Sequence, residues 1–107
     1  MTTFDKREEG FEKKYALDED MKFKAVARRN KLLGLWAAEK PGLSGDAATA
    51  YSKEVVAADF EEAGDQDVQN KVVKDFAAKG VAIAAAEVRV KMDQLMAQAV
   101  AQVKSGT

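Results

Sequence analysis

The sequence predicts an all-α protein, a four-helix bundle preceded by a flexible N-terminal segment. Four stretches carry apolar residues at three- and four-residue spacings, which is typical of amphipathic helices. Glycine, proline and capping residues separate these stretches, and 107 residues suffice for one hydrophobic core. We therefore divide the chain into a mobile segment, residues 1–19, and a helical bundle, residues 20–107.

The first helix is predicted to begin behind Asp18 or Asp20, either of which can cap it, and to run to about Lys40. The Pro-Gly pair at 41–42 ends it. Gly34 lies in its interior and lowers helix stability by about 1 kcal/mol, so we expect a neighbouring helix to approach closely there. The predicted apolar face contains Met21, Ala25, Leu32, Leu35 and Trp36, with Val26 and Leu33 beside them.

Two shorter helices are expected next. The second is predicted to begin at Ser44, as its cap, and to run to about Ala63, with Gly64 as a left-handed stop. The third is predicted to be capped by Asp65 and to run to about Lys79. Their predicted buried stripes are Ala47, Tyr51, Val55 and Ala58 in the second helix, and Val68, Val72, Val73 and Phe76 in the third.

The fourth helix is predicted to follow Gly80 and to run from about Val81 to Lys104. Residues 88–92 alternate in the manner of a strand, but the surrounding sequence lacks turn signals and exceeds strand length, which favours a helix. Its predicted stripe contains Ile83, Ala84, Val88, Leu95, Ala99 and Val103.

Composition argues against an enzyme. The chain has no histidine and no cysteine, which removes the commonest general base, the usual thiol nucleophile and two frequent metal ligands. We therefore expect no metal site and no catalytic residues. The longest apolar run, residues 81–86, is much shorter than the roughly 20 residues that span a bilayer, so we expect a cytoplasmic protein without direct membrane insertion.

Charge is unevenly distributed along the chain. Residues 1–20 hold four basic and seven acidic residues, residues 21–40 six and one, and residues 41–64 one and five. Neighbouring stretches of opposite sign could pair with one another. This pattern differs from the uniformly basic surface of nucleic-acid-binding proteins, so no nucleic acid is expected as a partner.

The basic stretch contains a candidate anion site. Lys24, Arg28 and Lys31 share one face of the predicted first helix and could bind a phosphate, including a weakly held nucleotide. The alternative is a solvated helix face that the acidic second helix partly neutralises. A phosphate-binding loop of the Walker type is not present, because Gly42–Asp46 lacks the lysine and the spacing.

The N-terminal segment carries an aromatic stripe. Phe4, Phe11 and Tyr15 fall at i, i+7 and i+11, within a wedge of about 40° on a helix. Crowded acids and Gly10 make an isolated helix unfavourable here. The segment could fold in a partner's groove, or its aromatics could pack back on the bundle as a fifth element.

Two motifs resemble a known family. Two runs are similar to the zeta subunit of alphaproteobacterial F-type ATP synthases: Phe4–Ala16, FDKREEGFEKKYA, which continues through residues 18–20 and Phe23–Lys24, and Ala27–Ala38, ARRNKLLGLWAA. The resemblance covers essentially the whole chain. It implies a four-helix bundle with a mobile inhibitory segment that wedges into a catalytic αβ interface of the soluble ATPase head and blocks ATP hydrolysis.

The resemblance also implies partners and a location. The partner would be the catalytic head, with its α, β and γ subunits, and the protein would lie peripherally at the inner membrane through the ATP synthase. We expect a monomer when free and no required cofactor. The alternative is a small helical adaptor, or a nucleotide- or phosphate-binding module, with another partner. The candidate partner-binding residues are Phe4, Asp5, Arg7, Glu8, Phe11, Lys14 and Tyr15.

Overall fold

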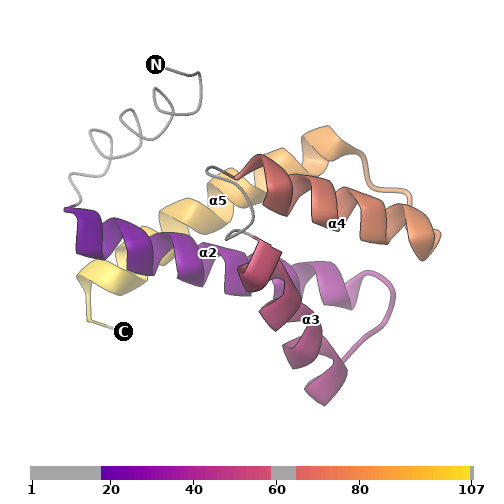
Figure 1. Cartoon of the computed structure of the whole chain (residues 1–107), viewed down its shortest axis with the longest axis horizontal. Helices are drawn as coiled ribbons and strands as arrows, with labels where there is room; N and C mark the ends of the chain where they lie inside the picture. Colours follow the sequence, from indigo (N-terminus) through magenta and orange to yellow (C-terminus); the bar gives the residue numbers. More distant parts are fainter. Residues whose placement is uncertain (1–17, 59–64, 107) are drawn as a thin grey trace.

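The computed structural model describes residues 18–58 and 65–106. This part contains four helices, α2 (Glu19–Glu39), α3 (Gly45–Ala58), α4 (Gln66–Ala78) and α5 (Ala85–Lys104), as Figure 1 shows. Helix α2 packs most extensively against α3 and α5, and only slightly against α4. The predicted all-α architecture with four packed helices is confirmed.

Both ends of α2 follow the sequence prediction. The Asp18 carboxylate accepts a hydrogen bond of 2.8 Å from the Met21 N–H, so Asp18 is the N-cap. After Glu39, Gly42 adopts a left-handed φ of 88°, and the Leu43 N–H reaches back to the Ala38 carbonyl at 2.9 Å. This is the Schellman arrangement, which satisfies carbonyls at a helix end.

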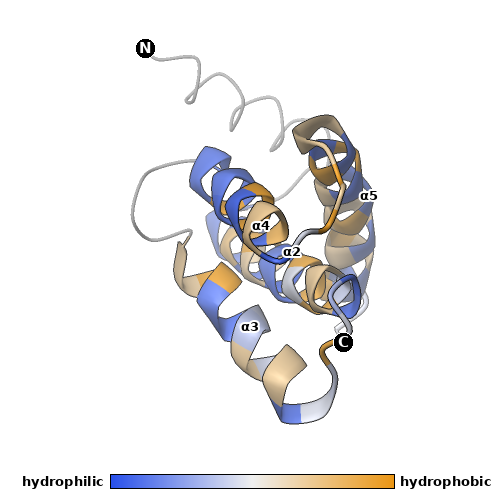
Figure 2. Cartoon of the chain, turned by 90° about the vertical axis from the view of Figure 1, so that its right-hand side faces the viewer, coloured by the Kyte–Doolittle hydropathy of each residue, from blue (hydrophilic) through white to orange (hydrophobic). Residues whose placement is uncertain are grey.

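Helix α3 begins directly after Ser44, as predicted, and the predicted end at Ala63 lies outside the described residues. Tyr51, Val55 and Ala58 are buried, but the prediction for Ala47 was wrong because this residue is exposed. The N-terminal end of α3 projects away from the other helices in Figures 1 and 2, so its first turn has little to pack against. The residue that packs there is Ala48.

Helix α4 has the predicted stripe and the predicted N-cap residue, Asp65, but the Asp65 side chain does not cap the helix. Asp65 precedes the helix without a side-chain hydrogen bond to its first turn. Its carboxylate instead pairs with two arginines, and such charge-assisted bonds are stronger than bonds to neutral N–H groups.

Helix α5 begins four residues later than predicted. Val81 to Ala84 form an extended link in which Val81 and Ile83 pack on the core while Ala82 and Ala84 are exposed. Apolar residues thus face inward with a period of two, which helical periodicity did not reveal. The alternating sequence at 88–92 is helical, as predicted.

The core has a large part and a small part. The large cluster joins all four helices and contains Leu33, Ala37, Ala38, Tyr51, Val55, Val68, Val72, Phe76, Val88 and Met92. The small cluster joins only α2 and α5 through Ala25, Met96 and Val100, with Met21, Val26 and Val103 at its edge. Because α2 and α5 are longer than α3 and α4, they extend together beyond the other two helices (Figure 1).

Gly34 explains how α2 and α3 approach so closely. A Cβ atom at Gly34 would lie 2.5 Å from the Cα of Ser52, closer than real contacts allow. The Ser52 hydroxyl donates a 2.9 Å hydrogen bond to the Lys31 carbonyl at the same crossing. The close neighbour expected from the sequence is therefore α3.

Candidate functional site

The candidate site has two parts, the N-terminal segment and the first turns of α2. The segment holds every residue predicted to bind a partner, and all of these lie outside the described residues: Phe4, Asp5, Arg7, Glu8, Phe11, Lys14 and Tyr15. Their roles stay predictions. The structure does describe where the segment joins the bundle, at the capping residue Asp18.

The three predicted anion-binding residues lie on one side of α2, in different surroundings. Lys24 forms an exposed ion pair with Asp20 at 3.3 Å. Arg28 donates a 3.2 Å hydrogen bond to the Gln102 side chain of α5, which ties it to the bundle, and Lys31 is exposed. Anion binding by these residues stays a prediction.

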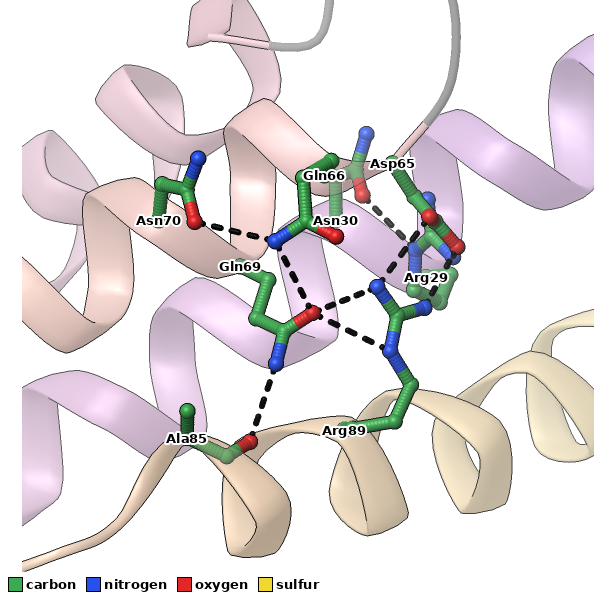
Figure 3. Close-up of polar contacts among 8 residues, drawn as sticks. All are labelled: Arg29, Asn30, Asp65, Gln66, Gln69, Asn70, Ala85 and Arg89. Carbon is green, nitrogen blue, oxygen red and sulfur yellow. Dashed lines mark hydrogen bonds and ion pairs between the residues drawn. The ribbon is translucent and has the colours of Figure 1, made fainter. Parts of the chain in front are cut away.

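Arg29 belongs to the same basic run but has a structural position that the sequence did not reveal. Its side chain is only 4% exposed and forms an ion pair of 3.6 Å with Asp65. Its Nε donates a 2.7 Å hydrogen bond to Asn30, which is also buried (Figure 3). Arg29 is therefore excluded from any surface that binds phosphate.

Asp65 is the centre of a polar network that joins three helices. Arg89 of α5 donates two hydrogen bonds to its carboxylate, at 2.7 and 3.2 Å, and also bonds the Gln69 side chain of α4. Gln69 in turn donates to the Ala85 carbonyl at the start of α5 (Figure 3). The sequence suggested only a helix-capping role for Asp65, so it did not reveal this interaction.

A second polar network joins α3 and α4. The Tyr51 hydroxyl donates to Asp75 at 2.8 Å, and Lys71 donates to both Asp75 and Glu54. Burial alone would raise the pKa of Asp75, but the hydrogen bonds from Tyr51 and Lys71 outweigh it and hold the pKa below its usual value. Burial and the bond to Asp75 raise the pKa of the Tyr51 phenol.

Trp36 of α2 lies half-buried against residues of α4 and α5. Its ring meets Phe76 edge-on at 5.8 Å, and the ammonium groups of Lys40 and Lys91 lie 5.2 and 5.7 Å from its centroid. These are cation–π contacts that cover the indole. Trp36 is therefore a packing residue, as the sequence predicted.

No group of three or more acidic side chains could hold a metal ion within residues 18–58 and 65–106. Nor is any described helix long and apolar enough to cross a membrane.

The comparison with protein families decides the identity. A family model described as ATPase inhibitor subunit zeta matches residues 1–102. The chain belongs to the ATPase inhibitor subunit zeta family. The family's members are regulators, so the prediction that this zeta chain is not an enzyme is confirmed, and its partner is an F-type ATPase.

A solved structure supports the fold of this zeta chain. The protein is similar to one whose solution structure was determined by NMR, with 56% sequence identity and a TM-score of 0.71. The alignment covers 81% of the zeta chain and 99% of the solved one. No curated protein sequence matched in a separate search.

Proposed function

We propose that this zeta chain inhibits ATP hydrolysis by inserting its N-terminal segment at a catalytic interface between the α and β subunits of the ATPase head. The observation that carries the proposal is the aromatic stripe of Phe4, Phe11 and Tyr15, in a segment that precedes a capped helix. Aromatic side chains commonly act as buried anchors in such interfaces. Steric trapping of a rotary enzyme requires no chemistry from the inhibitor.

The bundle supports this division of labour. Its buried charged side chain, Arg29, is engaged inside the fold by the partly buried Asp65. Because the Asp18 side chain caps the first turn of α2, the segment before it can change conformation without unwinding the helix. The bundle thus acts as a stable carrier, and the segment acts as the ligand.

The charged residues of the segment would complete the interface. Arg7 and Lys14 would pair with acidic groups of the ATPase head, and Asp5 and Glu8 with basic ones. Such pairs at the rim of an interface contribute mainly to specificity and to the association rate. The proposal therefore places most of the affinity in the aromatic stripe.

The test is a double substitution on the stripe with a matched control off the stripe. We expect Phe11→Ala/Tyr15→Ala to raise the concentration that half-inhibits ATP hydrolysis by about ten-fold or more, since 1.4 kcal/mol corresponds to ten-fold. The control Glu9→Ala/Lys13→Ala also removes two side chains, leaves the net charge unchanged, and lies on the opposite face of the helix. Equal potency of the two variants would contradict the assignment of the stripe.

A further inference from the structure

Phe23 is an aromatic side chain that the bundle leaves in water. It is 62% exposed in the second turn of α2. In the part of the chain that the structure describes, Val90, at 55%, is the other large apolar side chain left mostly exposed. A single exposed apolar residue needs no explanation by itself, so the surroundings of Phe23 have to decide its role.

The first surrounding feature is the position of Phe23 in the fold. It lies where α2 and α5 extend beyond α3 and α4, the part held together by the small core cluster (Figure 1). Phe23 follows Asp18, where the N-terminal segment joins α2, by five residues, or about 7 to 8 Å along the helix axis. A partner that holds the segment would therefore lie close to Phe23.

The second surrounding feature is charge. Lys24 and Lys31 are exposed on the same side of α2, and Ala27 lies between Phe23 and Lys31 at four-residue spacing. Lys24 pairs with Asp20, and Arg29 of the same basic stretch is buried, so Lys31 supplies most of the positive charge on this side. A surface that receives Phe23 would therefore be apolar at its centre and acidic at its edge.

We propose that Phe23, flanked by Lys24 and Lys31, is a second anchor that binds an apolar pocket with an acidic rim on the ATPase. This inference rests on the proposed function and extends it, because the binding surface then continues from the segment onto the folded bundle. Continuity with the segment and the basic flank favour the ATPase over a second copy of the chain. A compact aromatic anchor of this kind is typical of residues that dominate an interface.

The test compares full-length variants in an assay of ATP hydrolysis by the F-type ATPase head. We expect Phe23→Ser to raise the half-inhibitory concentration by about ten-fold, the size of effect that an anchor residue has. The control Val90→Ser removes the other exposed apolar side chain, in the first half of α5, and should change the concentration less than two-fold. Circular dichroism checks that both variants remain helical.

A charge variant tests the acidic rim. Lys31→Glu should weaken inhibition, most strongly at low salt, because the expected attraction becomes repulsion. Lys53→Glu makes the same change at an exposed lysine on α3 and should have little effect. Equal effects of the two substitutions would overturn the acidic-rim assignment.

The other possible results for Phe23→Ser show whether Phe23 binds something other than the ATPase. If Phe23→Ser inhibits like the wild type, the anchor is refuted while the proposed function stands. If Phe23→Ser inhibits better than the wild type, Phe23 binds the chain's own N-terminal segment and the proposal is wrong. If the substitution changes only self-association, Phe23 binds a second copy of the chain and the proposal is also wrong. If the wild-type chain itself does not inhibit, the proposed function fails and this inference fails with it.

Discussion

The two halves of α2 differ in how they are supported. The C-terminal half is enclosed: Leu33 is fully buried, and Gly34 meets the α3 backbone so closely that no side chain fits between them. The N-terminal half rests mainly on α5, through Ala25, and leaves Phe23 in water. One helix thus combines a stabilising half with a half that is available for binding.

The largest expected difference between the halves concerns core truncation. Phe76→Ala leaves a cavity in the large cluster beside Trp36 and should lower the free energy of unfolding by about 4 kcal/mol. Met96→Ala leaves a cavity in the small cluster, and the ends of α2 and α5 can partly close it. This substitution should lower the free energy of unfolding by about 2 kcal/mol. Urea denaturation measures both values, and hydrogen exchange should quicken in the first turns of α2 only for Met96→Ala. A larger loss for Met96→Ala would reverse the comparison.

The next effect concerns the ion pair between Arg29 of α2 and Asp65. Asp65→Asn removes the charge that faces buried Arg29, which should lower the free energy of unfolding by about 3 kcal/mol. Asp67→Asn removes a charge in the first turn of the same helix, where no such buried partner is described, and should cost well under half as much. Thermal or urea unfolding of the two variants gives the comparison. Similar losses would show that helix-end charge, rather than the arginine, is what matters.

The smallest effect concerns the pH dependence of the α3–α4 contact. Because the folded-state pKa of Asp75 lies below its unfolded value of about 3.9, its stabilising contribution is complete above that value and disappears as the pH falls through the folded pKa. Stability should therefore fall less steeply on acidification below about pH 4 in Asp75→Asn than in the wild type. Asp93→Asn, at an exposed position of α5, serves as the control. Parallel acid curves for Asp75→Asn and the wild type would contradict the assignment.

Local signals were sufficient to predict most of the fold. The cap at Asp18, the stop after Glu39 and the close contact at Gly34 each follow from the chemistry of one or two residues. The start of α5 did not, because Val81 and Ile83 fit a helical stripe as well as an inward-facing extended link. Only tertiary packing distinguishes the two.

The site was less predictable than the fold. Arg29 looks like its basic neighbours in the sequence, and its burial depends on Asp65, which is 36 residues away. Phe23 stood in one of the motifs that pointed to the zeta family, but its exposure depends on where α3 and α4 end. A one-dimensional pattern does not contain either piece of information.

The most direct test of the central claim is ATP hydrolysis by the F-type ATPase head with the full chain and with a chain that lacks residues 1–17. This deletion keeps Asp18, so the cap of α2 survives and circular dichroism should show an intact bundle. We predict inhibition by the full chain and at least a hundred-fold weaker inhibition by the shortened chain, since three anchors are lost with the segment. Undiminished inhibition by the folded, shortened chain would contradict the account.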